Sequence, residues 1–413
     1  MPLAIRVAAY LSVLTGYIFY CYNYIVVGYV RPFLVAQAGF SIADTALIAM
    51  AGNLGVTVGA IVWASFIARV GRRRAVAITA AGIGIMAAIQ ASQFILGMWV
   101  GGRFVMDALL GGYYVVATSL VVALFPQTSR AKLVALNSAM YPAANVVIGL
   151  LGGWLGETGW HTLLWLAVAP LGISVLLWFA VPDDSTYRPF GDGSDEVGLH
   201  PPAAQGGWRE MFSPRLRWLT VGCITLSGID FNAYQFFQGF VTLYVKNELG
   251  MSAGVMGAIV AAISAGAFAG NFFWAIIADR YGRRPPLLGY VFAAGMLLLF
   301  LQPGLEQLEL SIIGFMFGLG YSCTTAWGAW FAELFPPHLR THGAALFHAG
   351  HILAIGSPLL AAYTSETFGM TNSMAIAAVV YLAGAALWFV LPETLSRAKR
   401  GPIPSPAPAP GDT

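Results

Sequence analysis

Residues 63–74 read WASFIARVGRRR, and residues 274–284 repeat the pattern as WAIIADRYGRR. Each copy joins two apolar runs through a short arginine-rich turn. The match extends outward at nearly constant spacing, through the pairs Gly55 and Gly266, Phe125 and Phe335, Arg130 and Arg340, and Pro182 and Pro392. A period this long is too large for a solenoid unit. The sequence therefore predicts two copies of one domain.

The composition places the chain in a membrane. Hydrophobic residues make up 58% of it and charged residues 9%, against roughly 25% charged in a soluble domain. Apolar runs of about 20 residues, the length that crosses a bilayer, lie at 8–33, 45–67, 75–96, 99–124, 131–155 and 160–181, and again at 216–246, 252–277, 286–304, 308–332, 342–364 and 371–391. Lipid admits only helices or closed barrels, and these runs lack the alternation of barrel strands. We therefore expect an all-α membrane protein with twelve transmembrane helices in two related bundles of six.

Two polar stretches divide the chain. Residues 183–214 form a long interruption rich in Asp, Gly and Pro, which predicts a cytoplasmic linker between the bundles. Residues 396–413 form a proline-rich end, which predicts a disordered cytoplasmic tail. We therefore expect the two bundles at residues 1–182 and 215–395.

The basic residues predict the orientation of the helices. Most of the 21 Lys and Arg residues fall on one side of the expected spans, and only Arg31, Arg103 and Lys246 fall elsewhere. The positive-inside rule then places both termini in the cytoplasm of a multi-pass protein of the plasma (inner) membrane. The net charge of +3 belongs to this topology signal and gives no reason to expect a nucleic-acid partner.

The first expected span carries an aromatic face with a cation near its end. Tyr20, Tyr24 and Arg31 recur at helical spacing and share one stripe. A guanidinium near the outer end of a span needs a carboxylate, an anionic ligand or a route to the interface. The tyrosines can equally pack against neighbouring helices, and Arg31 can extend to the interface, so both interpretations stay open.

The fourth expected span contains a cation and an acid. Arg103 and Asp107 are four residues apart, so their side chains can meet on one face of the helix. Ionisable groups inside a membrane are functional by default. The alternative is an internal ion pair whose role is purely structural.

The seventh expected span contains a lone acid. Asp230 lies near its middle, and Tyr234 and Gln238 follow on nearly the same face. A carboxylate at that depth is costly in lipid, so it must face protein or a water-filled cavity. This face is therefore a candidate wall of a central site.

Three further spans contribute polar or aromatic groups. Asn145 lies in the fifth span, Trp327 in the tenth, and His348 and His351 are three residues apart in the eleventh. Each of them can line a cavity or contact a neighbouring helix. For the histidines, hydrogen bonding between helices competes with a proton-carrying role, since an imidazole titrates near neutral pH.

The sequence gives no sign of a metal centre or an enzyme active site. Cys21, Cys223 and Cys323 all fall inside expected spans, where they behave as small apolar residues. Neither a metal-ligand spacing, a disulfide framework nor a nucleophile–base pair is visible in it. We therefore expect neither enzymatic activity nor a cofactor.

These features resemble the major facilitator superfamily over essentially the whole chain. The residues that carry the resemblance are Ala275, Asp279, Arg280, Gly282, Arg283 and Arg284, the partner turn at Ala64–Arg73, Gly102-Arg103-Phe104, Glu333-Leu334-Phe335-Pro336 with Arg340, and Leu391-Pro392-Glu393-Thr394. The last two groups are similar to those of the branch that includes sugar porters and organic-acid:proton symporters. The resemblance implies two six-helix bundles that alternate access to a central site, with the first, fourth, seventh and tenth helices lining it.

The resemblance also implies a cytoplasmic gate. Its residues would be Arg69, Gly71, Arg72, Asp279, Arg280, Gly282, Arg283, Glu333 and Arg340. The two halves differ, because Ala68 stands where the family usually has Asp, and Ala123 stands where the second half has Glu333. Both acids are thus missing from the first half, which predicts an asymmetric gate. In the first helix, Asn23 stands where organic-acid symporters commonly carry an aspartate.

Taken together, the residues and the resemblance predict a secondary transporter of a small organic anion, coupled to protons; the anion would be a carboxylate, aromatic ones included. The expected substrate ligands are Arg31, Arg103, Tyr20, Tyr24, Tyr234, Gln238, Trp327 and Asn145, and the expected proton carriers are Asp107, Asp230, His348 and His351. We expect a monomer whose partners are the small-molecule substrate, protons and the lipid bilayer. A proton-driven exporter of amphipathic compounds and an uncoupled facilitator of a neutral solute such as a sugar are the alternatives.

Overall fold

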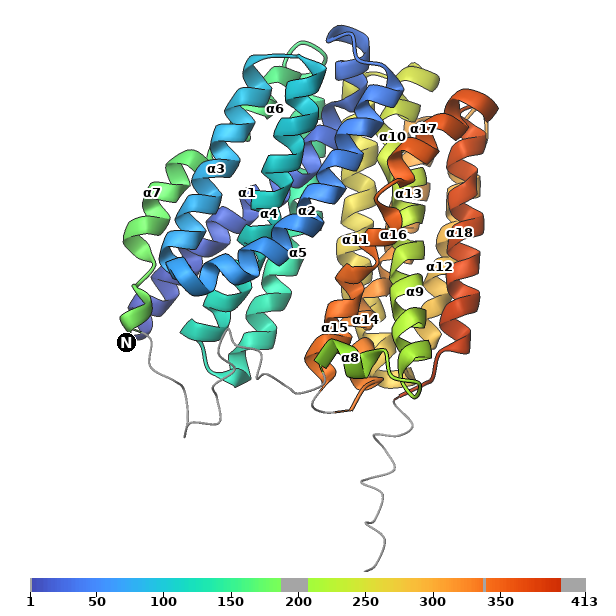
Figure 1. The fold of residues 1–413 in the computed structure, drawn as a ribbon. Helices are drawn as coiled ribbons and strands as arrows, with labels where there is room; N and C mark the ends of the chain where they lie inside the picture. Colours follow the sequence, from blue (N-terminus) through green and yellow to red (C-terminus); the bar gives the residue numbers. More distant parts are fainter. Residues whose placement is uncertain (1, 187–206, 337–338, 395–413) are drawn as a thin grey trace, which may run out of the picture.

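The computed structural model describes residues 2–186, 207–336 and 339–394. Within these ranges every regular element is a helix. Figure 1 shows the helices of the N-terminal half, coloured blue to green, in one bundle and those of the C-terminal half, coloured yellow-green to red, in a second bundle beside it. The predicted all-α fold of two bundles is confirmed. Most of the predicted linker and the predicted tail at 396–413 lie outside the described residues.

Six spans form the N-terminal bundle. They are α1 (Leu3–Gln37), α2 (Ile42–Val70), α3 (Arg72–Ser92), α4 (Leu96–Leu124), α5 (Gln127–Leu155), and the consecutive helices α6 (Trp160–Leu166) and α7 (Pro170–Ala180). The start of α2 is fixed by a capping box, because the Ser41 hydroxyl accepts a hydrogen bond from the Asp44 backbone and the Asp44 carboxylate accepts one from the Ser41 backbone. The sixth span is interrupted where Pro170 begins α7, since proline has no N–H to continue the preceding helix.

The C-terminal bundle repeats this order with more breaks. After the short α8 (Gly207–Met211) come α9 (Arg217–Phe236) with α10 (Gln238–Leu243) and a π-helical turn at Tyr244–Glu248, α11 (Ala253–Tyr281), a 3-10 turn at Pro285–Leu287 with α12 (Leu288–Phe300), α13 (Gln307–Tyr321) with a 3-10 turn at Ser322–Ala326 and α14 (Trp327–Glu333), α15 (Arg340–Ala349) with α16 (His351–Ala354) and α17 (Ser357–Phe368), and α18 (Met370–Val390). The seventh, tenth and eleventh spans are therefore built from discontinuous helices.

Most spans are long and apolar enough to cross a membrane on their own. The described residues contain 8 such helices, or 9 when the pair 342–354 and 357–368, bent by 42°, is taken as one span. The other three spans are the fifth and ninth, whose apolar parts at Ala139–Leu155 and Pro285–Phe300 are shorter, and the broken α9–α10 span. This arrangement agrees with the twelve predicted helices.

The internal repeat is visible in the helix packing. Gly55 lets α2 approach α4 closely, since a Cβ atom added there would lie 2.3 Å from the Phe104 backbone oxygen. The equivalent Gly266 lets α11 approach α13, where an added Cβ would lie 1.9 Å from the Phe315 backbone oxygen. Small residues commonly let helices pack closely in lipid. Each bundle therefore contains an equivalent close helix contact, as expected for two copies of one domain.

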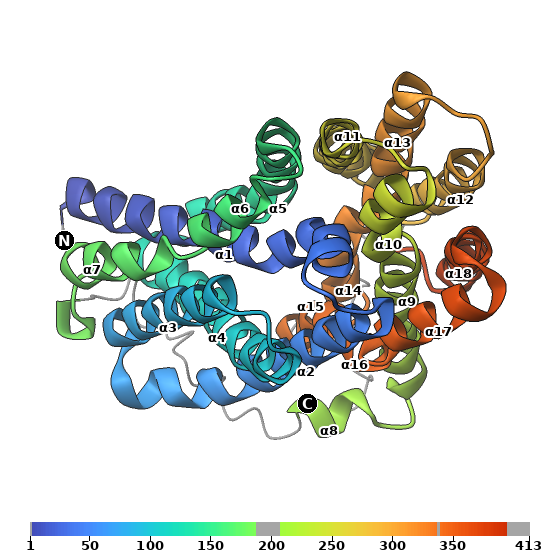
Figure 2. The same ribbon diagram turned by 90° about the horizontal axis from the view of Figure 1, so that it is seen from above.

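The contacts between the bundles gather at one end of the molecule, which we call the seam end. There α5 meets α11, and a Cβ atom added at Gly257 would lie 2.2 Å from the Gly149 backbone oxygen. The Thr242 hydroxyl of α10 donates to the Gly28 backbone oxygen of α1 over 2.9 Å. The opposite end, which we call the arginine end, carries the two arginine-rich turns and α8. Figure 2 shows the two halves from above, with the ends of α1 and α2 between them.

Candidate substrate site between the bundles

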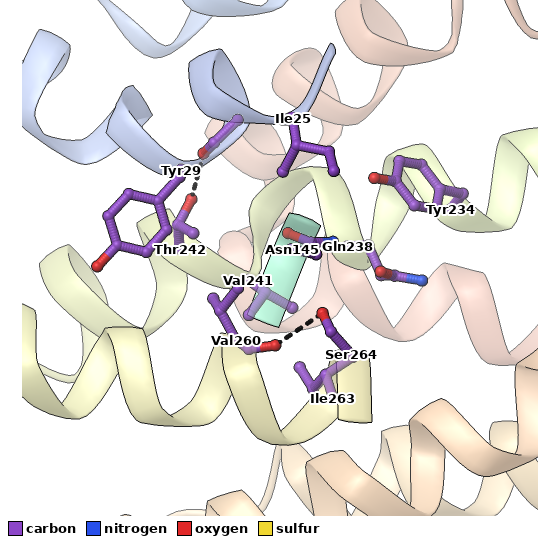
Figure 3. Close-up of a pocket in the computed structure, with 11 residues that line it drawn as sticks. Ile25, Tyr29, Asn145, Tyr234, Gln238, Val241, Thr242, Val260, Ile263 and Ser264 are labelled. Carbon is purple, nitrogen blue, oxygen red and sulfur yellow. Dashed lines mark hydrogen bonds between the residues drawn. The ribbon is translucent and has the colours of Figure 1, made fainter. Parts of the chain in front are cut away.

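A cavity lies between the two bundles near the seam end. It is lined by Ile25, Gly28 and Tyr29 of α1, Asn145 of α5, Tyr234 of α9, Gln238, Val241 and Thr242 of α10, and Val260, Ile263 and Ser264 of α11 (Figure 3). Its volume is about 60 Å³, which is room for a few water molecules or for part of a small ligand. The lining side chains that the structure describes are all uncharged, so the lining offers hydrogen-bonding groups and apolar surface but no charge.

Two polar atoms of the lining are buried without a partner. The Tyr29 hydroxyl and the Gln238 side-chain nitrogen make no hydrogen bond within the described part of the chain. The Tyr29 ring is held by Gly152 of α5, where an added Cβ would lie 2.3 Å from the ring. Because buried polar groups are nearly always satisfied in folded proteins, each of these atoms lacks a partner that folded proteins usually supply.

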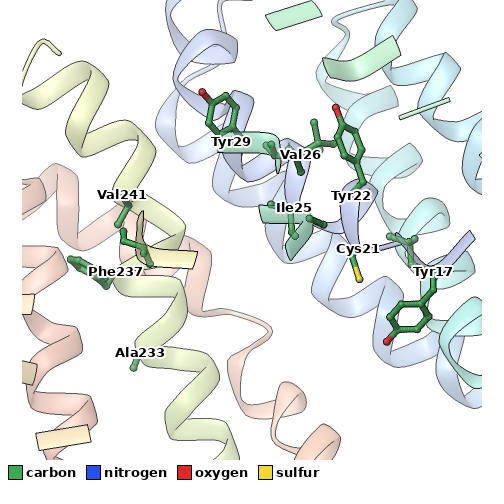
Figure 4. Packing of buried hydrophobic residues seen from close by; sticks show 14 of the residues in the cluster. Tyr17, Cys21, Tyr22, Ile25, Val26, Tyr29, Ala233, Phe237 and Val241 are labelled. Atoms are coloured by element: carbon green, nitrogen blue, oxygen red, sulfur yellow. The ribbon is translucent and has the colours of Figure 1, made fainter. Parts of the chain in front are cut away.

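A break in the seventh span shapes one side of the cavity. Phe237 separates α9 from α10 and is fixed by ring contacts at 5.4 Å with Phe300 and 4.6 Å with Phe317. The break turns α10 toward α1, and Figure 4 shows Phe237 pointing away from the α1 residues such as Ile25. Backbone groups freed by such a break need new partners within the protein. Arg31 of α1 uses the Gly239 backbone oxygen, near the start of α10, as an acceptor.

Arg31 joins the bundles at the seam end. Its Nε donates to the Thr45 hydroxyl at 2.8 Å, and its Nη1 donates to the Gly239 backbone oxygen at 2.5 Å. The guanidinium also lies 4.5 Å above the Phe240 ring, and the residue is 4% exposed. Arg31 therefore connects α1, α2 and α10 in this conformation and does not extend to the membrane interface. Its Nη2 is buried without a partner.

Arg103 and Asp107 form a buried ion pair on α4. Arg103 Nε and Asp107 Oδ2 are 2.9 Å apart, and their side chains are 6% and 3% exposed. The other two guanidinium nitrogens donate to the backbone oxygens of Asn23 and Tyr24 on α1, at 3.0 and 3.1 Å. Asp107 Oδ1 has no hydrogen-bond partner among the described residues. The pair thus ties α4 to α1 next to Tyr24.

A row of tyrosines continues from the cavity toward the middle of the molecule. The hydroxyls of Tyr234 and Tyr141 are 3.1 Å apart and join the two bundles. Tyr141 and Tyr24 have ring centroids 6.0 Å apart, and those of Tyr20 and Tyr114 are 6.4 Å apart. Tyr20 and Tyr24 are one turn apart on α1, so the row runs along this helix. It provides planar apolar surface together with hydroxyl groups.

The predicted substrate ligands therefore occupy different places. Tyr234, Gln238 and Asn145 line the cavity, and Tyr20 and Tyr24 belong to the adjoining row of tyrosines. Trp327 is completely buried in the C-terminal bundle, with its ring 5.2 Å from Trp388 and 5.4 Å from Phe331. It is a packing residue in this conformation, and its role as a ligand stays a prediction.

Asp230 faces the interior of the C-terminal bundle. Its Oδ1 accepts a hydrogen bond from the Tyr290 hydroxyl of α12 at 2.7 Å. Tyr290 is completely buried, and its ring lies 5.0 Å from that of Tyr381 on α18. Asp230 thus contacts its own bundle, although Tyr234 on the same helix lines the cavity between the bundles. Its role as a proton carrier stays a prediction.

His348 and His351 flank the break between α15 and α16. Gly350 lies at this break, and a Cβ atom added there would lie 2.4 Å from the Ser227 hydroxyl of α9. His351 Nδ1 lies 3.2 Å from the His348 backbone oxygen, and the two rings are parallel with centroids 6.1 Å apart. The His348 ring is exposed and lies 5.3 Å from the Tyr114 ring of α4. Because Tyr114 belongs to the other bundle, His348 faces the space between the bundles.

The arginine end of the C-terminal bundle holds a network around Arg283. Arg283 Nη2 and Nε donate to the two Glu333 oxygens at 2.7 and 3.1 Å, and Nη1 donates to Asp279 at 2.7 Å. Hydrogen bonds from the guanidinium to Glu333 raise the pKa of Arg283, so it stays charged. The Thr394 hydroxyl donates to Glu333 at 2.5 Å, and the Glu393 carboxylate accepts from the Arg283 backbone at 2.9 Å. The turn is therefore tied to α14 and to the end of α18.

The N-terminal turn keeps only part of this network. Asp184 accepts a hydrogen bond from the Arg72 backbone at 2.8 Å and pairs with the Arg72 side chain at 3.5 Å. Gly71 has a φ of 83° and Gly282 a φ of 116°, so both turns use the left-handed conformation that glycine tolerates best. Asp184 thus accepts from the backbone at the start of α3 as Glu393 does after Gly282. Ala68 and Ala123 stand where the second half has Asp279 and Glu333, so these two positions supply no acid to the N-terminal turn.

The remaining predicted gate residues lie at the surface of the same end. Arg69 lines a surface pocket with Asp183 and Asp184, and hydrogen bonds from Ser185 lower the pKa of Asp183. The Arg280 guanidinium lies 5.5 Å above the Tyr281 ring, and Arg340 is exposed at the start of α15. Their roles as gate residues stay predictions.

Sequence reasoning did not identify several lining residues. Tyr29 belongs to the aromatic first helix, so its residue type gave a signal. Ser264 gave none, because serine in a membrane helix commonly bonds its own backbone, as the Ser264 hydroxyl does to the Val260 oxygen at 2.9 Å (Figure 3). Thr242 donates a hydrogen bond to the Gly28 backbone oxygen, and residue types do not reveal such a contact.

Two repeated six-helix bundles with a cavity at their interface are typical of secondary transporters. The family model described as Major Facilitator Superfamily matches residues 13–237 and 226–410. The chain belongs to the Major Facilitator Superfamily. It is accordingly a multi-pass membrane transporter and not an enzyme.

Individual relatives are more distant. The chain is similar to the cis,cis-muconate transport protein of Acinetobacter baylyi, with 23% identity over 303 residues that cover 70% of this chain and 68% of that protein. It is 25% identical over 298 residues to the probable 4-methylmuconolactone transporter of Cupriavidus pinatubonensis, covering 69% of this chain and 66% of the relative. A solved structure of a bacterial homolog of the human lysosomal transporter Spinster, inward-facing and unoccupied, matches with a TM-score of 0.74 at 17% identity, covering 94% of this chain and 96% of that one. This structural likeness shows the fold alone.

Proposed function

We propose that the protein is a proton-coupled secondary transporter that takes up a small organic acid through the cavity between its bundles. The observation that carries this proposal is the cavity itself, which is lined by α1 and α5 of one bundle and by α9, α10 and α11 of the other. Transporters built from repeats bind their substrate at such an interface, and movement of one bundle against the other exposes the site to each side in turn.

We also propose an orientation and a conformational state. Most of the Lys and Arg residues fall on the side of the arginine end, so the positive-inside rule puts this end and both termini in the cytoplasm. The seam end then lies on the side of the inner membrane opposite the cytoplasm. With the bundles joined at the seam end, the described conformation is inward-facing.

Three observations favour an organic acid as the substrate. The relatives are named for muconate and 4-methylmuconolactone. In this chain, the Gln238 amide and the Tyr29 hydroxyl can donate to the carbonyl or hydroxyl oxygens of a ligand. The row of tyrosines beside them offers flat surface to an unsaturated chain or a ring. We therefore assign a small unsaturated or aromatic carboxylic acid as the substrate class.

Proton coupling is assigned to the Arg103–Asp107 pair. Protonation of Asp107 would remove the charge that Arg103 binds, while Arg103 also holds two backbone oxygens of α1. Loosening this contact would free α1 near Tyr24, which leads through Tyr141 to Tyr234 in the cavity. A proton on Asp107 and a ligand among the tyrosines would then support each other, with a coupling of about 1–3 kcal/mol typical of linked sites.

Uptake into proteoliposomes tests the proposal. With an alkaline interior, labelled cis,cis-muconate or benzoate should accumulate above its external concentration, and a protonophore should abolish the accumulation. Liposomes without protein are the control for the slow leak of protonated acid. Uptake that only equilibrates under the gradient would contradict proton coupling, and absence of uptake of every acid tested would contradict the substrate class.

An uncoupled facilitator of a neutral solute is the second candidate. It is favoured by the cavity lining, which has no charged side chain and has two unpartnered donors that suit hydroxyl groups. In that case a sugar would equilibrate across the proteoliposome membrane at a rate independent of the pH gradient. The same preparation would then take up no acid.

The two arginines stay candidate anion ligands under this proposal. Each would first have to release protein acceptors, which are Thr45 and Gly239 for Arg31 and the α1 backbone for Arg103. Arg31→Lys keeps the charge but loses the planar, two-pronged donor geometry that matches a carboxylate. If acid binding is unchanged in Arg31→Lys and in Arg31→Ala, Arg31 is not a ligand.

A further inference from the structure

An organic acid in the membrane interior needs a cation, and the cavity lining provides none. Arg103 uses its three nitrogens on Asp107 and on the α1 backbone. Arg31 retains one unpartnered nitrogen, but it is 4% exposed and enclosed by Thr45, Gly239 and the Phe240 ring at the joined seam. In this conformation neither guanidinium is open to a ligand that enters between the bundles.

The position of His348 allows it to provide this cation. Its ring is exposed, and it faces Tyr114 of the other bundle at 5.3 Å, so the exposed surface lies on the side between the bundles. Within the described part of the chain, no hydrogen bond to the His348 ring is found. Tyr114 also adjoins Tyr20, with ring centroids 6.4 Å apart, so His348 stands at the end of the tyrosine row that leads to the cavity.

His351 supports His348 from the next turn. Its ring is parallel to that of His348 and lies 3.5 Å from the Phe231 ring of α9, which fixes its orientation. His351 Nδ1 lies 3.2 Å from the His348 backbone oxygen and donates to it. Nε2 is then the ring nitrogen that can accept a proton. Two neighbouring imidazoles repel when both are charged, so the pair favours a single positive charge.

The charged groups on the surrounding helices have other partners or lie elsewhere. On α9, Asp230 accepts from Tyr290, and on α14, Glu333 binds Arg283. On α2, Asp44 and Arg69 lie near the two ends of the helix. On α4, the group that faces His348 is the neutral Tyr114. Among the described residues, no carboxylate forms an ion pair with either histidine, so a bound anion would be its counterion.

We propose that His348, with His351 behind it, is the site for the substrate carboxylate, and that one proton binds there together with each carboxylate. Tyr114 and the adjoining Tyr20 would contact the rest of a small acid, at the far end of the tyrosine row from the neutral cavity. The inference rests on the proposed function, because it assumes that the ligand is an organic acid. It assigns to the histidines the anion recognition that the sequence assigned to Arg31 and Arg103.

Calorimetry on the purified full-length protein tests this site with cis,cis-muconate and benzoate as probes. Measurements at pH 6, 7 and 8 in two buffers of different ionisation enthalpy give both the affinity and the number of protons taken up. We expect the histidines to take up about one proton per bound benzoate, in addition to any proton that Asp107 takes up, and each of these protons lowers the affinity by up to about tenfold per pH unit once its free site is neutral. Benzamide, which has the same ring but no charge, should show no such dependence.

Three variants separate this site from others. His348→Gln should weaken benzoate binding at pH 6 at least tenfold and lower the associated proton uptake by about one proton per benzoate. His348→Lys should restore binding without the dependence on pH between 6 and 8. His342→Gln is the matched control, because His342 lies on the same helix but packs against Trp208 at 5.2 Å. It should leave benzoate binding unchanged.

The outcomes distinguish this inference from the proposed function. Unchanged proton uptake and affinity in His348→Gln would overturn the histidine site and leave the proposed transport intact. If His348→Gln does not fold, Asp107→Asn decides: proton uptake that persists supports the histidines, and its loss overturns them. A wild-type protein that binds neither acid at any of the three pH values contradicts the proposed substrate class itself.

Discussion

The seam end and the arginine end hold the molecule together in opposite ways. At the seam end, contacts cross from one bundle to the other, with Gly257 of α11 against Gly149 of α5 and α10 hydrogen-bonded to α1. At the arginine end, every ion pair that the structure describes lies within one half, as between Arg283 and Glu333. The first kind of contact must break when the bundles separate at that end. The second kind keeps each bundle rigid while it moves.

The largest expected effect comes from the seam. Gly257→Ala puts a Cβ atom 2.2 Å from the Gly149 oxygen, and overpacking of this kind costs about 1–3 kcal/mol. The cost applies only while the seam is joined, so the state described here should be depopulated and the rate of proteoliposome uptake should fall about tenfold. Gly254→Ala is the matched control, since its Cβ would lie at 3.7 Å from the Gly153 oxygen. Equal rates in the two variants would show that the seam does not control transport.

The next effect concerns the rigidity of the C-terminal bundle. Arg283→Ala removes a two-pronged contact to Glu333 and leaves this acid and Asp279 without their cation, so we expect a loss of about 2–3 kcal/mol of stability. Arg72→Ala removes a longer and more exposed pair with Asp184, worth under about 1 kcal/mol. Chemical denaturation in detergent measures both. A larger loss for Arg72→Ala would reverse the proposed asymmetry of the two turns.

Asp107→Asn tests whether a proton on Asp107 is coupled to transport of the acid. The variant mimics the protonated acid permanently, so transport should lose one coupled proton while acid binding is retained. Each coupled proton is equivalent to about 1.4 kcal/mol per pH unit, and the accumulation ratio under a gradient of one unit should fall about tenfold. Accumulation equal to that of the wild type would leave Arg103–Asp107 as a structural ion pair.

The smallest effect is expected at Asp279, whose side chain is 76% exposed. Stability should change little in Asp279→Asn, but the gate implied by the family resemblance would lose its acid in the C-terminal half. The protein should then favour the state with the seam joined by a few-fold, more than Ala68→Asp changes it. Reaction of single cysteines at each end with a membrane-impermeant reagent measures this. Shifts of the same size in both variants would refute an asymmetric gate.

The fold was predictable because it depends on long-range patterns that residue types preserve. The repeat of the arginine-rich turn and the apolar runs gave the two bundles, and the glycines that match between the halves mark the same close contacts. Gln238 is a candidate because it shares a helix face with Asp230, a carboxylate that must face protein or water. Asn145 is a candidate because a polar side chain in a span either lines a cavity or contacts a neighbouring helix. They do line the cavity.

The partners of the charged residues were not predictable from residue types. Arg103 and Arg31 bind backbone oxygens, and every residue carries one, so the sequence does not show which will be used. The side-chain direction of Asp230 also depends on packing. Its helix face borders both its own bundle and the cavity, and its partner Tyr290 lies 60 positions away in the sequence. These details depend on helix breaks, such as the one at Phe237, whose local sequence contains no proline.

Distances between spin labels show whether the seam end and the arginine end open in turn. One pair of labels at Ala36 and Asn247 reports on the seam end, and another at Ser65 and Ala345 reports on the arginine end; all four positions are surface-accessible, and the native cysteines are buried. Pulsed electron paramagnetic resonance with and without cis,cis-muconate, at pH 6 and 8, should reveal two states. If the two ends open in turn, a longer Ala36–Asn247 distance always accompanies a shorter Ser65–Ala345 distance. Distances that lengthen together, or that respond to neither muconate nor pH, would contradict alternation between the two ends.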